Sequence, residues 1–321
     1  MKAADLWAIT KKTVTDFSEN NPMNYAAILS YYTVFSLPAV IILILRLAGL
    51  VLGQEAVSGE LFGQLSGIVG AQTAKDIQGI VAASSKSDSG TVATIVGLVT
   101  LIISGTTVFV ALQEALNNVW GVKAKPEKGW LKYLINRGLS VSVVGAIAFL
   151  LLVSLAVEAA VRLVSGYLQV VFGPFAELLA KVIDLAVSAG FTTVLFAIIF
   201  KVLPDAVVRW RNVWTGAFIT ALLFSIGRSL IGWYIEFSDT ESAYGAAGSV
   251  VLLMVWVYYS AVILLLGAEF TKVYSLYNGQ EIEPSAHAVK VEVKEVHKNA
   301  DGAVEVEKDK TAEKHHNALD A

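Results

Sequence analysis

Six long apolar stretches restrict what this sequence can fold into. They cover about residues 31–52, 91–112, 138–160, 182–203, 213–235 and 244–268, and none contains more than two charged side chains. About 20 apolar residues in a helix cover the roughly 30 Å hydrocarbon core of a bilayer. The sequence therefore predicts an all-α fold, a polytopic membrane helical bundle with six transmembrane helices.

The composition of the chain excludes several other classes of protein. Hydrophobic residues make up 55% and charged residues 16% of the sequence, which is too little charge to cover the surface of an ordinary soluble domain. The chain has no cysteine, which excludes disulfide scaffolds and thiolate metal sites. A net charge of −3 does not favour nucleic acid as a partner. We expect no metal and no cofactor.

The distribution of lysine and arginine predicts the orientation of the bundle. Twelve of them lie in the N-terminal segment, the second and fourth connections and the C-terminal flank, against four in the other connections. Because positive residues favour the cytoplasmic side of short loops, both termini are predicted to be cytoplasmic.

Local patterns predict further features of the membrane domain. Residues 3–19 have the spacing of an amphipathic helix on the membrane surface, and Asn20-Asn21-Pro22 ends it, so that a new helix begins near Asn24. Pro38 should kink the first span. The long connection at 53–90 has the spacing of two amphipathic helices.

The composition changes near residue 280, which divides the chain into a membrane domain at 1–279 and an acidic tail at 280–321. Valine alternates with charge at 288–296 and again at 303–306, a pattern that also fits a hairpin. An isolated hairpin is marginal in water, so a disordered cytoplasmic tail is the preferred interpretation.

Four charged residues lie within or beside the outer halves of the spans, and they form the candidate polar cavity. They are Arg46, Glu158, Asp184 and Arg228. Charged side chains are costly inside a bilayer and usually face a partner or a cavity. One interpretation is a cavity that binds a charged headgroup or an ion. The other is that the arginines extend to the outer interface and pair structurally.

The sequence offers no candidate catalytic residues. It contains no phosphate-binding loop and no HExxH or GxSxG motif, and all four histidines lie in the acidic tail. A catalyst based on histidine would therefore have no pocket around it.

Four strings of the sequence follow the pattern of a known family. They are NYAAILSYYTVFSLPAV (24–40), ALQEALNNVWGV (111–122), LPDAVVRWRNVWTGAFITALLF (203–224) and YGAAGSVVLLMVWVYYSAVILLLGAEF (244–270). Together they resemble the YihY/virulence-factor BrkB family of bacterial inner-membrane proteins, across about residues 5–275. The resemblance implies family-pattern positions at Asn117, Trp120, Gly121, Pro204, Trp210, Gly216, Tyr244, Gly245, Trp256, Gly267 and Glu269.

The resemblance implies a multi-pass protein of the bacterial inner membrane with membrane lipids as partners. The leading hypothesis is a transporter of a lipid or another amphiphile that contributes to envelope integrity. The second is a non-catalytic membrane scaffold that recruits an envelope partner through its loops or tail. Beside lipids, the expected partner is either an envelope protein or a second copy of the chain. The third is a membrane-embedded enzyme. The family's older ribonuclease label belongs to this third hypothesis. It is disfavoured because the predicted cytoplasmic face offers no carboxylate cluster and no ordered histidine.

Overall fold

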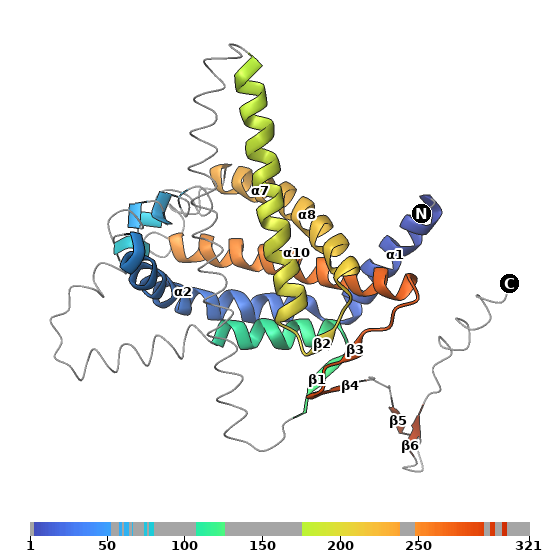
Figure 1. Ribbon diagram of the computed structural model, residues 1–321. Coiled ribbons are helices and arrows are strands. Elements are labelled where there is room, and N and C mark those ends of the chain that lie inside the picture. Colours follow the sequence, from blue (N-terminus) through green and yellow to red (C-terminus); the bar gives the residue numbers. More distant parts are fainter. Residues whose placement is uncertain are drawn as a thin grey trace, which may run out of the picture.

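The computed structural model describes residues 3–52, 58–59, 61–63, 66, 74–75, 77–79, 107–125, 175–237, 248–291, 296–298 and 304–306. Most of these residues are helical, as predicted, and short strands gather at one end of the packed helices (Figure 1). The third predicted span, at 138–160, and most of the second lie outside the described residues.

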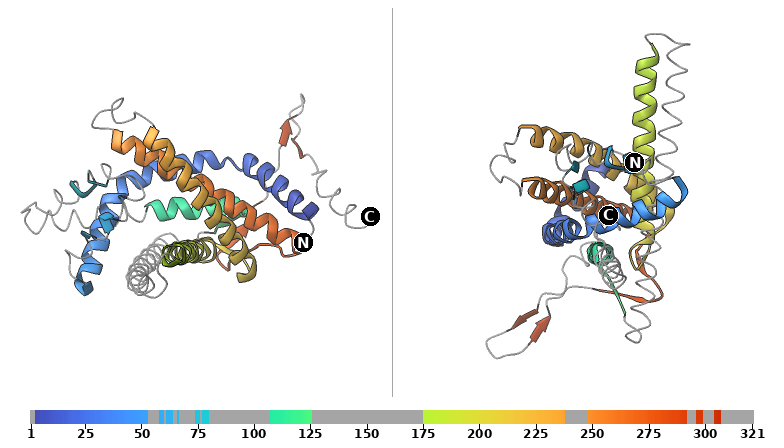
Figure 2. Two further views of the ribbon diagram at one scale, coloured as in Figure 1. Left: turned by 90° about the horizontal axis from the view of Figure 1, so that it is seen from above. Right: turned by 90° about the vertical axis from the view of Figure 1, so that its left-hand side faces the viewer.

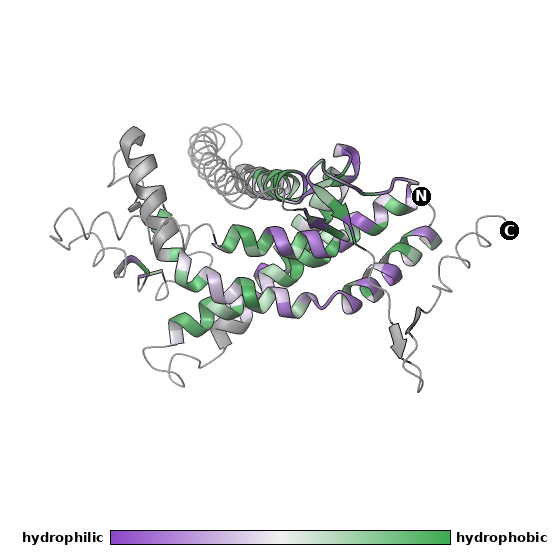
Figure 3. Cartoon of the chain, turned by 90° about the horizontal axis from the view of Figure 1, so that it is seen from below, coloured by the Kyte–Doolittle hydropathy of each residue, from purple (hydrophilic) through white to green (hydrophobic). Residues whose placement is uncertain are grey.

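The first two helices follow the sequence prediction closely. Helix α1 spans Ala3–Glu19, and its inward side contributes buried Ile9 and Thr13. Hydrophobic and hydrophilic residues alternate along it (Figure 3). Helix α2 spans Pro22–Leu52 and starts two residues before the predicted position, because proline lacks an N–H and fits the first turn of a helix. Helix α2 stays helical through Pro38.

Three long helices cover the last three predicted spans. Helix α7 spans Phe175–Val202, α8 spans Trp210–Phe237 and α10 spans Gly248–Tyr277. Helix α10 extends nine residues past the predicted end of the sixth span, because Phe270 and Val273 on its last turns pack against Ile9 of α1. Helix α8 contacts both α7 and α10, and α10 also contacts α2 and α1 (Figures 1 and 2).

The long connection after α2 is described only in short pieces. Residues 58–59, 61–63, 66, 74–75 and 77–79 are helical, as the amphipathic pattern predicts for part of this connection. Phe62, Ala74 and Ile77 are buried in a cluster with Leu253 of α10. The connection therefore contributes side chains to the end of the bundle that lies away from the strands.

Two pairs of short strands tie the start of the predicted tail to the helices. Strand β1, Val122–Ala124, pairs antiparallel with β4, Ala288–Lys290, and β2, Ala206–Val207, pairs with β3, Glu283–Pro284. Ile282 is buried in the main core.

Residues 281–291, which the composition assigns to the acidic tail, therefore pair with strands of the helical region. Their alternating valines meet a backbone edge at 122–124 that only the folded chain provides. Further along, β5, Val296–Lys298, pairs antiparallel with β6, Val304–Val306.

The outward side of α8 is apolar over most of its length. Large exposed side chains recur about every four residues, and we call them the α8 stripe: Trp210, Trp214, Phe218, Leu222, Ile226, Leu230 and Trp233. The distance along the helix from Trp214 to Trp233 is about 28 Å, close to the thickness of the hydrocarbon core. By length and composition, two described segments are able to cross a membrane, Trp210–Ile231 and Val250–Tyr277, and a shorter apolar segment covers Ala186–Val202.

Candidate functional site

Polar side chains from distant parts of the sequence meet at the end of the bundle that carries the strands. They come from the α1–α2 turn, the 107–119 helix, the α7–α8 connection, the first turn of α8 and the end of α10 with the segment after it. We call this cluster the polar junction, and its members are Asn20, Gln113, Asn117, Asp205, Asn212, Glu269, Lys272, Ser275 and Gln280.

Glu269 is the most deeply buried charge of the polar junction. Its side chain has 0% relative exposure. The Lys272 Nζ lies 2.9 Å from Oε1, and Asn20 Nδ2 donates a hydrogen bond of 2.8 Å to Oε2. Because the partners come from α10 itself and from the α1–α2 turn, this carboxylate fixes the start of α2 to the end of α10.

Asn117 performs the same task between the 107–119 helix and the α7–α8 connection. Its Nδ2 donates to Asp205 Oδ2 at 2.9 Å, and its Oδ1 accepts from the Asp205 backbone N–H at 2.8 Å. Gln113 Nε2 donates to the same carboxylate oxygen at 3.2 Å. The amide and the carboxylate therefore satisfy each other, as buried polar groups usually do.

Asn212, on the first turn of α8, connects that helix to the end of α10. It is buried, and its Nδ2 donates to Ser275 Oγ at 2.9 Å and to Gln280 Oε1 at 2.8 Å. Gln280 is held by the cap of α10, in which its backbone N–H bonds the Ser275 carbonyl. Gly279, with φ +67°, makes this cap possible, because a left-handed residue is required there.

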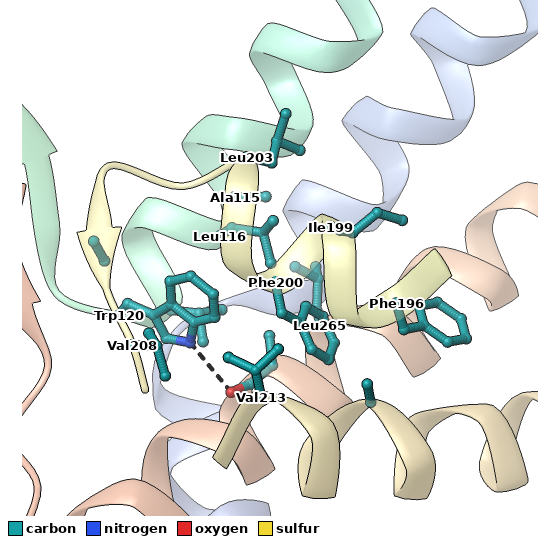
Figure 4. Packing of buried hydrophobic residues seen from close by; sticks show 14 of the residues in the cluster. Ala115, Leu116, Trp120, Phe196, Ile199, Phe200, Leu203, Val208, Val213 and Leu265 are labelled. Carbon is teal, nitrogen blue, oxygen red and sulfur yellow. Dashed lines mark hydrogen bonds between the residues drawn. The ribbon is translucent and has the colours of Figure 1, made fainter. Parts of the chain in front are cut away.

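Trp120 and Gly121 end the 107–119 helix against the core. Trp120 is buried, stacks edge-on with Phe200 and donates through Nε1 to the Ala268 carbonyl at 3.3 Å (Figure 4). Gly121 has φ +63°, which turns the chain into β1, and its carbonyl accepts from the Val291 backbone N–H at 2.8 Å. Trp120 therefore packs the end of the 107–119 helix against the core, and Gly121 allows the chain to turn into the strand pairing.

Gly216 and Gly267 allow α8 and α10 to approach closely just beyond the polar junction. A Cβ atom on Gly216 would lie 1.8 Å from Thr271 Oγ1, and one on Gly267 would lie 1.9 Å from Thr220 Oγ1. Each threonine hydroxyl donates to the glycine carbonyl four residues earlier in its own helix, at 2.7 Å in both cases. Two Gly-xxx-Thr segments thus face each other in antiparallel register, the kind of small-residue contact that membrane helices favour.

The side chains of the polar junction form hydrogen bonds and an ion pair with one another. Among the described side chains, every buried nitrogen or oxygen atom has a hydrogen-bond partner. The described residues also contain no group of three acidic or histidine side chains that could hold a metal ion. The polar junction therefore holds segments from distant parts of the sequence together.

The candidate polar cavity remains a prediction. Arg228 lies on α8 with its side chain exposed. Arg46 lies on α2 and Asp184 on α7, but their side chains are outside the described part, as is the whole of Glu158.

The remaining family-pattern positions are spread more widely. Pro204 is buried in the α7–α8 connection, Trp210 is half exposed at the start of α8, and Trp256 packs against Phe224 in the middle of the bundle. Tyr244 and Gly245 lie outside the described residues. Sequence reasoning did not identify the other members of the polar junction as site residues: Asn20, Gln113, Asp205, Asn212, Lys272, Ser275 and Gln280. The one available signal was that polar residues stand directly beside helix ends.

The comparison with protein families decides what kind of chain this is. The model of the virulence factor BrkB family matches residues 13–292. The chain belongs to this family. The match ends after β4, so the BrkB-family region includes the strand pairs that close the polar junction.

Curated relatives of this BrkB-family chain are membrane proteins. A UPF0761 membrane protein of Tolumonas auensis is 29% identical over 179 residues, which are 56% of this chain and 56% of the relative. One of Alkalilimnicola ehrlichii is 30% identical over 190 residues, 58% of this chain and 40% of the relative. One of Idiomarina loihiensis is 37% identical over 94 residues, 29% of this chain and 33% of the relative. The chain thus spans between a third and just over half of the length of these relatives. No solved structure matches it significantly.

Proposed function

We propose that this BrkB-family chain is a multi-pass protein of the bacterial inner membrane that moves a lipid or another amphiphile. In this proposal six helices cross the bilayer, and both termini lie in the cytoplasm. The gathering of four lysine-rich, predicted cytoplasmic segments at one end of the bundle supports this orientation. The α8 stripe supports a span, because apolar side chains bounded by tryptophans suit lipid chains and headgroup regions.

The observation that carries the transport proposal is the exposed guanidinium of Arg228. Arg228 lies on α8 five residues before Trp233, the tryptophan at the proposed outer end of the α8 stripe. This is a distance of about 8 Å along the helix. A cation at this depth requires an anionic partner or water. A guanidinium binds phosphate or carboxylate through paired hydrogen bonds, and both groups occur in lipid headgroups and amphiphiles.

Reconstitution in liposomes tests this function. Labelled phospholipids should change leaflet faster in vesicles that contain the full chain than in empty vesicles. Arg228→Gln should lower that rate by about fivefold or more, because the charge is lost while most of the length remains. Lys290→Gln removes the same charge from an exposed surface position and should leave the rate unchanged.

Two results would overturn the transport proposal. If no labelled lipid or amphiphile moves faster than in empty vesicles, the scaffold hypothesis becomes the better one. If lipid moves but Arg228→Gln and Lys290→Gln behave alike, Arg228 has no part in the path. Far-ultraviolet circular dichroism of each variant in detergent shows that the helices have formed.

A further inference from the structure

A cluster of cations and tryptophans lies where α8 begins, at the end opposite Arg228. We propose that it binds the headgroup phosphate of an anionic phospholipid whose acyl chains lie along the α8 stripe. We call it the anchor site, and its members are Lys201, Arg209, Trp210, Arg211 and Trp214. The proposal rests on the proposed membrane span of α8, but it does not depend on transport.

The fixed position of Lys201 is the first argument for the anchor site. Its Nζ donates to the Val208 carbonyl at 2.6 Å and lies 5.8 Å from the centre of the Trp210 ring. A lysine held by a carbonyl and an aromatic face loses little further freedom when it binds an anion. Its remaining N–H groups can point to a phosphate oxygen.

The two tryptophans place the anchor site at the depth of headgroups. The rings of Trp210 and Trp214 lie 6.4 Å apart and are tilted by 32°, and both side chains are about half exposed. Tryptophan prefers the membrane interface, where its ring meets apolar chains and its N–H meets polar groups. From Trp214 the α8 stripe continues through Phe218 and Leu222, so one lipid can contact cations and apolar side chains together.

The local charge selects an anionic occupant. Arg209 and Arg211 are exposed on either side of Trp210. Two described carboxylates belong to the segment before α8 and to the strand paired with it: Asp205, whose Oδ2 accepts from Gln113 and Asn117, and the exposed Glu283, which pairs with Val207 between β2 and β3. Three cations therefore stand against two carboxylates, an excess of positive charge that suits an anionic leaflet better than a zwitterionic one.

Lipid retention in native mass spectrometry tests the proposal on the full chain. Phosphatidylglycerol should remain bound to a larger fraction of the protein than phosphatidylcholine. The double substitution Arg209→Gln and Arg211→Gln should reduce retained phosphatidylglycerol by roughly tenfold, since two charges near the headgroup are lost. Lys290→Gln should leave retention unchanged, and Arg211→Lys should retain most of it.

The proposal is overturned if the two lipids are retained equally, or if the double variant retains phosphatidylglycerol as the unaltered chain does. A separate measurement compares the thermal midpoint of the protein with inorganic phosphate and with phosphatidylglycerol. If phosphate alone raises the thermal midpoint as much as phosphatidylglycerol does, the site binds free anions and not lipid. If the double variant fails to fold, Arg211→Gln alone, on an exposed helix position, gives the same comparison. Because Arg228 lies at the other end of α8, failure here leaves the transport test unaffected.

Discussion

The polar junction and the α8 stripe are built in opposite ways, although both involve helix α8. The junction buries the Glu269 carboxylate completely and holds three partly buried contacts of asparagine or glutamine side chains beside it. The stripe leaves large apolar side chains uncovered over about 28 Å of helix. In water each arrangement is unfavourable unless something compensates for it.

The compensation differs between the two regions. In the polar junction it is internal, because each buried donor or acceptor among the described side chains has a protein partner. For the α8 stripe it is external, and a lipid phase would supply it. Stability at the junction should therefore depend on partner side chains, whereas stability of the stripe should depend on the surrounding medium.

The largest expected effect is the removal of the partner of Glu269. Lys272→Met leaves a fully buried carboxylate without its cation and should cost about 3–5 kcal/mol of unfolding free energy in detergent. Glu269→Gln should cost only about 1–1.5 kcal/mol, because Lys272 has 22% of its side chain exposed and can reach solvent. Denaturation with SDS measures both. Equal losses for the two variants would mean that Glu269 does not depend on its lysine.

The next effect tests the α8 stripe. Leu222→Lys places a charge midway between Trp214 and Trp233 and should cost about 2.5–3.5 kcal/mol on membrane insertion, seen as a reduced membrane-inserted fraction. The matched change Val289→Lys, at a similarly exposed apolar side chain on β4, should have little effect. If both variants insert normally, α8 does not face lipid at Leu222.

A pair of truncations tests how much the strands add to the polar junction. Ending the chain after Gln280 removes buried Ile282 together with β3 and β4, and should lower stability by about 1.5–3 kcal/mol. Ending it after Val291 keeps these contacts and should change the thermal midpoint little. Equal stability of the chains that end at Gln280 and at Val291 would place the domain boundary at residue 280, as the composition predicts.

The smallest effect concerns the close approach of α8 and α10. Gly216→Ala should cost about 1–3 kcal/mol, because the added carbon would collide with Thr271. Combining it with Thr271→Gly removes the side chain that the added carbon would meet on the facing helix. The double variant should therefore recover most of the lost stability. Thr271→Gly alone provides the remaining corner of the double-mutant cycle. Additive losses in the double variant would show that the two positions do not contact each other.

Much of the helical framework could be predicted from the sequence. The break at Asn20-Asn21-Pro22 and the helices over residues 182–203 and 213–235 follow from local signals, because breakers and apolar length act within a few residues. The strands could not be predicted in the same way. Strand β1 has three residues, and its partner β4 lies about 165 residues later in the chain.

The candidate site was predicted only as a set of separate positions. The family resemblance named Asn117, Gly216 and Glu269, but not what they contact. The structural role of the buried Glu269 depends on its hydrogen-bond partners. One of them, Asn20, lies 249 residues away in the sequence. Such contacts depend on tertiary packing, which apolar periodicity alone does not encode.

The antiparallel pairing of β1 with β4 also has a consequence for the timing of biosynthesis. Strand β1 leaves the ribosome about 165 residues before β4. At 5–20 residues per second, it waits roughly ten to thirty seconds for its partner. During this interval Gly121 has been synthesised but Val291, to which it bonds, has not, whereas Asp205, to which Asn117 bonds, follows Asn117 by only 88 residues. A nascent chain arrested before residue 280 should therefore be more sensitive to added protease at 118–125 than a released one.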